Sequence, residues 1–391
     1  MSDLLNGRWQ ETKEALLEGL SGIRRSSMSV TLENTRKYLA ESASAGATSA
    51  GNVATLNRVI LPVIRRVMPT VIANELVGVQ PMTGPVGQIH TLRVRYSDTS
   101  ANAGVLAGEE ALSPFKIAAS YSGNETAATP RAGSTATLEG AAGKRMSIQI
   151  LKQVVEAKTR KLSARWTFEA AQDAQAQQGI DIEAEIMAAL AQEITAEIDQ
   201  EILGSLRSLA GTAVETYDQS AVSGVATFVG DEHAALAVQI NRAANLIAQR
   251  TRRGAGNYAV VSPMALTILQ SATTSAFART TEGTFEAPTN TKFVGTLNSA
   301  MRVYVDSYAS DSTGVLIGYK GSSESDAPAF YCPYIPLMSS GVVLDPSTFE
   351  PVVSFMTRYG YVELTNTASS LGNAADYLAN VAITSGAVKF S

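Results

Sequence analysis

The chain has 391 residues, with 31 Lys and Arg against 36 Asp and Glu and a formal net charge of −5, so its length corresponds to two or three folding units of about 150 residues. This balance argues against a dedicated nucleic-acid binder, and 45% hydrophobic with 17% charged residues excludes global disorder. The single cysteine, Cys332, excludes an intrachain disulfide and fits a reducing compartment. Neither an apolar run of about 18 residues nor an apolar leader is found, so no membrane helix or secretory signal is predicted.

The N-terminal residues have the pattern of an appendage. Residues 1–20 alternate apolar and charged residues with helical spacing and predict a short amphipathic helix. The basic pair Arg24 and Arg25 follows, and residues 42–52 are small and uncharged, which is typical of a flexible tether.

The next segment begins as helix and continues as strand. Residues 53–77 are apolar with helical spacing, and Pro62 and Pro69 divide them into two short helices. The sequence QIHTLRVRY (88–96) alternates and predicts a strand. Residues 97–145 contain few large apolar residues, and we expect a long excursion from the core that includes a two-stranded ribbon.

Residues 146–166 again predict strands, and the most regular helical pattern of the chain follows over 181–206. Its apolar residues recur at every fourth position and predict a helix of about 40 Å at 1.5 Å per residue; they are Ile182, Ile186, Leu190, Ile194, Ile198 and Ile202.

Residues 211–345 have the pattern of a separate α/β unit. Asp231 begins a helix that ends before Gly254, and Ser262 caps a second helix that has Pro263 at its first position. Strands are predicted at 257–261, 301–306 and 314–319, and the alternation of 342–364 is again that of strands. The predicted fold class is α+β.

No motif for catalysis or cofactor binding is complete. The two histidines, His90 and His233, lack metal-ligand neighbours and triad partners, and we interpret both as packing or capping residues. The glycines near Lys144 do not have phosphate-loop spacing, and Gly254 and Gly256 follow a helix where a dinucleotide fold requires a strand. We therefore expect no enzymatic activity, no cofactor and no metal.

One charge pattern is unusual. Seven bases and one acid occupy 144–165, whereas seven acids and no base occupy 181–201. The two blocks can pair within one chain or between neighbouring copies, where such pairing sets orientation more than stability. The residues we select as candidate contacts between subunits are Lys158, Arg160, Lys161, Arg165, Glu183, Glu185, Glu193 and Glu197.

Several segments, in the same order along the chain, resemble the major capsid proteins of contractile-tailed (myovirus-type) bacteriophages in the HK97-like superfamily. They are RRVMPTVIANELVGVQPMTGPVGQIHTLRVRY (65–96), EAKTRKLSARWTFEAAQDAQAQQGIDIEAEI (156–186), EITAEIDQEIL (193–203), QRTRRGAGNYAVVSP (249–263), IGYKG (317–321), FYCPYIPL (330–337) and TFEPVVSFMTRYGYV (348–362).

The resemblance implies an HK97-like capsid fold with named parts. These would be an N-terminal arm (1–52), helices and a first strand of the P-domain (53–96), an E-loop (97–145), the P-domain with its long spine helix (146–210), an A-domain (211–345) and a C-terminal return to the P-domain (346–391). We expect the arm and the E-loop to lie against neighbouring copies rather than against their own subunit.

Relatives are trimmed by a phage protease that prefers Leu or Ile, any residue, then Glu before a small residue. Leu39-Ala40-Glu41 followed by Ser42 fits this preference, which makes 1–41 a candidate propeptide, and Glu18 followed by Gly19 fits as well. The alternative is a permanent arm.

The implied function is self-assembly into hexamers and pentamers that form an icosahedral head around packaged double-stranded DNA, without a specific DNA site and without a membrane. Further partners would be a portal, a scaffold, a prohead protease and decoration proteins, and the chain would be made in the host cytoplasm before it enters the virion. The alternatives are an encapsulin-type nanocompartment shell and a cytosolic α/β enzyme.

Overall fold

The computed structural model divides the chain into two compact units. Unit 1 comprises Met1–Gly87, Val154–Gly204 and Phe330–Val362, and unit 2 comprises Gln88–Gln153, Ser205–Ala329 and Glu363–Ser391. The residues that the structure describes are 9–10, 13–14, 17, 22–45, 72–101, 103–111, 118, 120–123, 132–140, 142–178, 181–222, 229–251, 253–272, 277–279, 292–298, 300–364, 373–384, 386 and 388.

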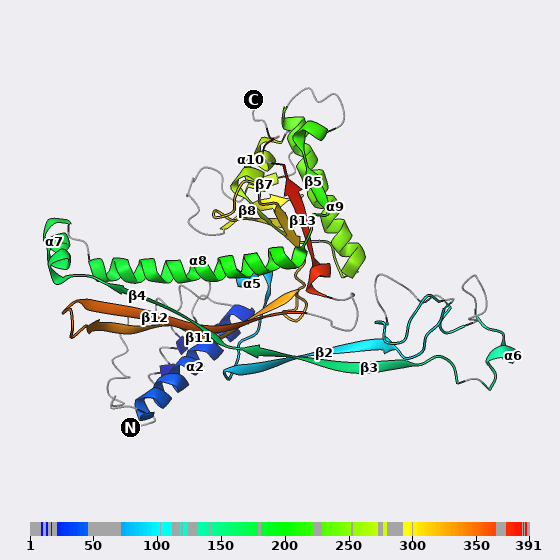
Figure 1. Ribbon diagram of the computed structural model, residues 1–391, viewed down its shortest axis with the longest axis horizontal. Helices are drawn as coiled ribbons and strands as arrows, with labels where there is room; N and C mark the ends of the chain where they lie inside the picture. Colours follow the sequence, from blue (N-terminus) through cyan, green and yellow to red (C-terminus); the bar gives the residue numbers. More distant parts are fainter. Residues whose placement is uncertain are drawn as a thin grey trace. The chain divides into compact units, whose positions relative to one another are not determined.

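Unit 1 is built on a four-stranded sheet in the order β1-β11-β12-β4 (Figure 1). Its strands are β1 (Gly78–Val79), β11 (Ala329–Leu344), β12 (Pro351–Glu363) and β4 (Lys158–Arg165). The strand β12 runs antiparallel to β4, with Val352 opposite Arg165 and Tyr359 opposite Lys158. Alternate residues of β12 are buried from Pro351 to Tyr359, as expected for a strand with one covered face.

The long helix predicted from the sequence is confirmed as α8 (Ile182–Ala210). Its apolar stripe is fully buried from Leu190 onward, whereas Ile182 and Ile186 are half-buried. The helix continues four residues beyond the predicted end at Leu206. Helix α7 (Phe168–Gln178) precedes it, and α5 (Ala73–Leu76) is the described end of the region predicted as two short helices; residues 53–71 lie outside the described residues.

Helix α2 (Gly22–Ala45) corrects the expectation for the N-terminal arm. Where we predicted a tether from residue 42, the helix continues to Ala45, and it packs on its own unit 1. The Nδ2 of Asn34 donates to the carbonyl of Met82 at 2.7 Å and to that of Tyr334 at 3.0 Å. The buried face of α2 mixes apolar and polar residues, so the sequence shows little hydrophobic periodicity there; this face comprises Ser27, Met28, Thr31, Leu32 and Asn34.

Unit 2 contains a seven-stranded sheet in the order β5-β13-β10-β6-β9-β8-β7. Its strands are β5 (Glu215–Tyr217), β13 (Leu378–Ile383), β10 (Val315–Gly318), β6 (Tyr258–Val261), β9 (Met301–Val305), β8 (Lys292–Leu297) and β7 (Phe277–Arg279). Helices α9 (Val229–Thr251) and α10 (Pro263–Ser271) bury their apolar residues in the same core as these strands. The predicted cap is present, because Ser262 Oγ accepts a hydrogen bond from the Ala265 amide at 3.3 Å. Two short 3₁₀ helices, η1 (Gln219–Ala221) and η2 (Ala374–Tyr377), also belong to unit 2.

The sheets correct two predicted boundaries. The range 211–345 included β11, but β11 pairs in the unit 1 sheet. The range 346–391 was expected to return to the P-domain, but β13 within this range pairs with β10 and β5 of unit 2. The alternation of apolar and polar residues identifies a strand and its two faces, but it does not identify the sheet that the strand joins.

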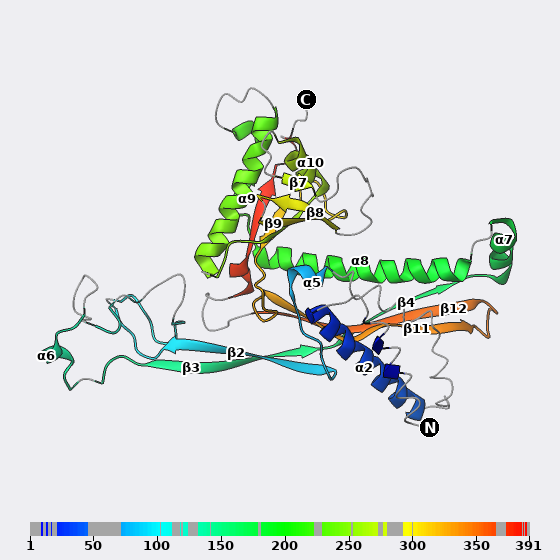
Figure 2. The same ribbon diagram turned by 180° about the vertical axis from the view of Figure 1, so that it is seen from behind.

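The expectation of a two-stranded ribbon within 97–145 is not met by the described residues of that range; the strands predicted on either side of it pair instead. Strands β2 (Val86–Tyr96) and β3 (Met146–Glu156) form a two-stranded sheet (Figure 2). The described part of 97–145 contains the short helix α6 (Thr135–Leu138), and its residues Val105, Ala111 and Tyr121 form a small cluster with Tyr96 at the end of β2. His90 of β2 is exposed, contrary to the packing role that we predicted, whereas His233 of α9 is buried. No helix in the described ranges is long and apolar enough to cross a bilayer.

Candidate interaction surfaces

A four-residue charged cluster joins β4, β12 and α8 within unit 1. The guanidinium of Arg160 donates from Nη1 to Glu197 and from Nη2 to Glu201, both at 2.5 Å. Its Nε donates to the hydroxyl of Tyr359 at 2.6 Å, and that hydroxyl donates in turn to Glu201. One side chain of the basic block therefore binds two carboxylates of the acidic helix and a tyrosine of the neighbouring strand.

The cluster keeps its charges at neutral pH. Burial alone would raise the pKa of Glu201, but hydrogen bonds from Arg160 and Tyr359 hold that pKa below its ordinary value. Burial and the hydrogen bond to Glu201 raise the pKa of the Tyr359 hydroxyl, which stays protonated. Glu197 and Glu201 are one helical turn apart and repel each other, and the guanidinium bound to both compensates that repulsion.

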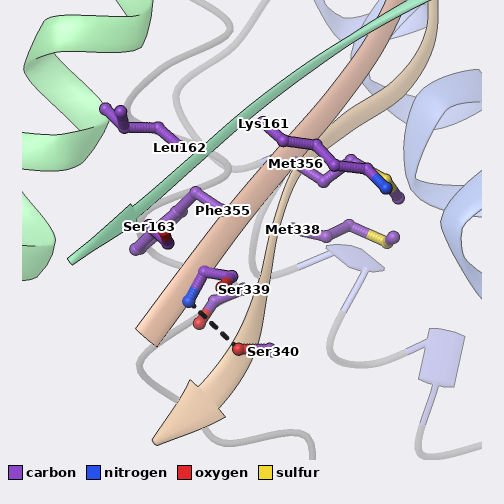
Figure 3. A pocket seen from close by; sticks show the side chains of 9 residues that line it. Lys161, Leu162, Ser163, Met338, Ser339, Ser340, Phe355 and Met356 are labelled. Atoms are coloured by element: carbon purple, nitrogen blue, oxygen red, sulfur yellow. Dashed lines mark hydrogen bonds between the residues drawn. The ribbon is translucent and has the colours of Figure 1, made fainter. Parts of the chain in front are cut away.

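The other candidate charges are not brought together within one chain. Arg165 approaches Glu350 at 3.8 Å, and Lys158 contributes to the lowered pKa of Glu201. Within the described part of the chain, none of the bases at 158, 161 and 165 pairs with the acids at 183, 185 and 193. Glu183, Glu185 and Glu193 are exposed on α8, and Lys161 is exposed on β4, where it points away from Leu162 (Figure 3).

Lys161 lines a groove of about 480 Å³ on the sheet of unit 1. Figure 3 shows Lys161, Met338 and Met356 pointing to the same side of the sheet, away from Leu162. Lys161 lies directly opposite Met356 in the β4–β12 register, and the amide of Ser354 donates to Ser340 Oγ at 3.1 Å. The complete lining is Lys161, Leu162, Ser163, Met338, Ser339, Ser340, Ser354, Phe355 and Met356. This face combines a cation, hydroxyls and two flexible apolar side chains.

Strand β3 of unit 2 carries an exposed apolar stripe. Within unit 2, the side chains of Met146, Ile148 and Ile150 are each more than half exposed, and their spacing of two places them on one face of the strand. Neighbouring exposed apolar side chains of this kind make β3 a candidate protein contact. The end of the β2–β3 sheet is fixed by Arg145, whose amide donates to Asp98 at 2.9 Å.

The candidate cleavage bond between Glu41 and Ser42 lies within helix α2, not at the start of a flexible tether as the sequence predicted. The alternative after Glu18 falls outside the described residues. Since a protease binds its substrate as an extended chain, cleavage after Glu41 would require the end of α2 to unwind.

The sequence did not identify Tyr359 as part of the charged cluster. The sequence shows only that Tyr359 lies on the same face of β12 as Val353 and Phe355, because the three residues are an even number of positions apart. The partner strand and the register with β4 are needed to place its hydroxyl beside Arg160.

Comparison with known proteins identifies the family. The family model described as "Major capsid protein Gp23" matches residues 53–144 and 116–386. The major capsid protein of Vibrio phage KVP40 is 31% identical over 427 residues, which covers 85% of this chain and 82% of that protein. The major capsid protein of Enterobacteria phage T4 is 31% identical over 411 residues, with 83% and 78% covered. A solved structure of the capsid of Myoviridae phage XM1 aligns with a TM-score of 0.46 at 11% identity, covering 80% of this chain and 91% of that one.

The family match spans most of the chain, and both relatives are matched over more than three quarters of their own length. The chain therefore belongs to the Gp23 family of major capsid proteins, which form the heads of myoviruses.

Proposed function

We propose that the chain assembles into hexamers and pentamers that close into an icosahedral phage head around packaged double-stranded DNA. Membership in the Gp23 family carries this proposal and favours the phage head over a nanocompartment shell. The exposed apolar stripe of β3 supports it, since one chain needs several different contact patches to build a closed shell.

We assign the parts of the HK97-like fold with corrected boundaries. The sheet of β1, β11, β12 and β4 with α8 is the P-domain and its spine helix. The seven-stranded sheet, including β13, is the A-domain, and β2 and β3 are the arms of the E-loop. In this assignment, the apolar stripe of β3 lies against a neighbouring subunit, whereas α2 belongs to its own.

The charge blocks divide into two roles. Arg160 and Glu197 act within one subunit, as their 2.5 Å contact indicates. Lys161 and Arg165 are exposed on the sheet, and we assign them to the acids of an adjacent copy, Glu183, Glu185 and Glu193. Each exposed pair contributes about 0.2–1 kcal/mol, and repetition around a capsomer multiplies this small contribution.

The same proposal includes the DNA that the head encloses and the other phage proteins that the chain meets. A net charge of −5 favours a lining that repels the genome and lets it move during packaging, since a basic lining would bind it through counterion release. The chain would be made in the host cytoplasm and meet a portal, a scaffold, a prohead protease and decoration proteins.

Negative-stain microscopy of the expressed full chain tests the proposal. We expect closed particles tens of nanometres across, and particles from infected cells should contain double-stranded DNA. Particles that enclose protein cargo without DNA would support a nanocompartment, and a chain that stays monomeric at high concentration would contradict the proposal.

A further inference from the structure

The N-terminal residues form a second layer on helix α2. The described residues of 9–17 are helical, and Trp9, Lys13 and Leu17 recur at every fourth position, which places them on one face of that helix. Leu17 is buried, and the other two contact α2. Both views show these dark-blue pieces beside α2 (Figures 1 and 2). We name the described residues of 9–17 the strap; they are Trp9, Gln10, Lys13, Glu14 and Leu17.

A single carboxylate of α2 binds the strap at two points. Glu33 Oε2 accepts a hydrogen bond from the indole Nε1 of Trp9 at 3.3 Å and another from Lys13 Nζ at 3.4 Å. Its second oxygen, Oε1, accepts from Arg36 Nη1 at 3.4 Å. Since Arg36 belongs to α2 itself, it orients the carboxylate of Glu33 from within the same helix and leaves Oε2 to the strap.

Glu33 is ionised at neutral pH, which strengthens these contacts. Burial alone would raise its pKa, but the hydrogen bonds from Trp9 and Lys13 and the charges of Lys13 and Arg36 hold that pKa below its ordinary value of 4.5. Hydrogen bonds to an ionised carboxylate are about twice as strong as those to a neutral group. Protonation of Glu33 would therefore weaken both of its contacts with the strap.

The strap and α2 are attached with different strength. The contacts of the strap with Glu33 join side chains, and the Glu33 side chain is 34% exposed, so solvent screens them. The next residue of α2, Asn34, is only 6% exposed and donates to the carbonyls of Met82 and Tyr334. Two adjacent residues of α2 thus bind a weakly held outer layer and a firmly held inner surface.

We propose that the strap is a releasable element that Glu33 latches to α2, and that it opens while α2 stays bound to unit 1. The least stable part of a folded unit opens first, and the screened contacts of the strap make it that part. Opening makes the N-terminal residues accessible to a partner, such as a protease, without disturbing the rest of the subunit. This inference goes beyond the proposed assembly and does not depend on it.

Acrylamide quenching of Trp9 fluorescence measures the opening in the unassembled full chain. Trp166→Phe removes the other tryptophan, so the remaining emission comes from the strap. In this background, Glu33→Gln should increase the open population roughly five- to tenfold, because a partly exposed carboxylate loses its charge-assisted hydrogen bonds. The emission should also move to longer wavelength as the indole meets water.

A second ion pair between the strap and α2 provides a matched control. Arg25 Nη2 lies 2.8 Å from Glu14 Oε2, but the two side chains are 47% and 67% exposed. Because an exposed ion pair contributes little, Arg25→Gln should change the quenching by less than about twofold. Equal quenching in Glu33→Gln and Arg25→Gln, or no change in Glu33→Gln, would overturn the latch.

Acid titration tests the latch without a substitution in it. The folded pKa of Glu33 lies below 4.5, so the latch is complete above that pH and opens as the pH falls through the lowered pKa. Quenching of Trp9 should therefore rise on acidification before the far-ultraviolet circular dichroism changes. Glu33→Gln should lack this rise, and a rise of the same size in that variant would overturn the role of Glu33.

Limited proteolysis tests whether the strap opens separately from α2. A glutamyl endopeptidase can cut after Glu11, Glu14 and Glu18 in the N-terminal residues and after Glu41 in α2. We expect the cuts up to Glu18 to precede the cut after Glu41, and Glu33→Gln to speed only the earlier cuts. Simultaneous cutting of both segments would mean that the strap and α2 open as one piece, which would overturn the proposal.

Trp9→Phe keeps the latch testable where Glu33→Gln fails to fold. It retains an aromatic ring but lacks the indole N–H, so the early cuts should again be faster while the cut after Glu41 keeps its rate. Unchanged early cuts would contradict a latch through the indole. All of these measurements use the unassembled chain, so the latch and the capsid assignment stand or fall separately.

Discussion

Arg160 on strand β4 and Glu201 on helix α8 are 41 positions apart in the sequence, and their side chains meet at 2.5 Å. The same guanidinium also binds Glu197 and Tyr359. Because these residues come from two strands and the helix beside them, the cluster fixes where α8 lies on the sheet of unit 1. It is a stabilising contact of the subunit, in contrast to the exposed charges around it.

Replacing Arg160 should destabilise unit 1. Arg160→Met leaves two carboxylates one turn apart without their cation, and we expect a loss of roughly 1–2 kcal/mol, since hydrogen bonds to charged groups are worth about 1.5–3 kcal/mol before solvent screening of a partly exposed site. Urea unfolding followed by tryptophan fluorescence measures this, because both tryptophans, Trp9 and Trp166, belong to unit 1.

Lys161→Met provides the control for that measurement. Lys161 neighbours Arg160 on β4 but points to the other face of the strand, so its loss should change stability by less than about 0.5 kcal/mol. A similar loss in both variants would mean that β4 simply tolerates substitution poorly.

The stability of unit 1 should fall at acid pH through Glu201. Its pKa in the folded chain lies below the ordinary value of 4.5, so its contribution is complete above that value and is lost as the pH falls through the folded pKa. Glu201→Gln should lower stability at pH 7 and flatten the dependence below pH 4.5. Melting curves between pH 7 and pH 3 measure this, with Glu193→Gln on the exposed face of α8 as control; parallel curves for Glu201→Gln and the unaltered chain would contradict it.

The sequence predicted the elements whose pattern is local. The four-residue apolar repeat of 182–202 specifies α8, and Ser262 before Pro263 specifies the start of α10, because both signals lie within a few turns of chain. The asymmetry of the charge blocks left pairing within one chain open, and Arg160 and Glu197 pair in this way, although we selected both as contacts between subunits.

Features that depend on distant partners were not predictable in this way. Helix α2 is held by Asn34 through the carbonyls of Met82 and Tyr334, and neither contact leaves an apolar period in 22–45. Phe349 is exposed at a positive φ after the turn that Asp345 and Ser347 form, and no hydrophobic pattern in the sequence encodes that conformation. Alternation likewise could not place β13 in the unit 2 sheet.

Loosening α2 should expose the bond after Glu41. Asn34→Ala leaves the carbonyls of Met82 and Tyr334 without this donor, at a cost of about 1–3 kcal/mol. Since cleavage needs an extended substrate, a glutamyl endopeptidase should cut after Glu41 faster in Asn34→Ala than in the unaltered chain. Mass spectrometry of the fragments over time measures the rates.

The packing of α2 through Asn34 also affects what we expect of maturation. N-terminal sequencing of virion protein decides between a propeptide that ends at Glu41 and a permanent arm, and with α2 packed on its own subunit we expect the permanent arm. If mature protein begins at Ser42, α2 must leave the sheet before trimming, and Glu41→Gln should then block the cut.

We expect contacts between subunits to involve the exposed charged side chains rather than those held in the Arg160 cluster. Arg160 forms ion pairs with Glu197 and Glu201 in its own subunit, so Arg160→Glu would lower the stability of the subunit as well as its ability to assemble. Lys161 and Arg165 avoid this difficulty, since both are exposed and the only described ion pair of Arg165 is its 3.8 Å approach to Glu350.

The double reversal Lys161→Glu with Arg165→Glu should therefore impair assembly while the unassembled chain melts normally. Repulsion between the new carboxylates and the acids of the neighbouring α8 is screened by salt, so the defect should be strong at low ionic strength and weaker near 1 M, where the Debye length is about 3 Å. Light scattering at a series of salt concentrations measures it. In the double-reversal chain, one of Glu183, Glu185 and Glu193 can in turn be replaced by Lys. Assembly should be restored when the replaced acid is the one that faces Lys161 or Arg165 of the neighbouring copy. Normal assembly of the double reversal at low salt would contradict the proposed pairing and show that these two bases are solvated.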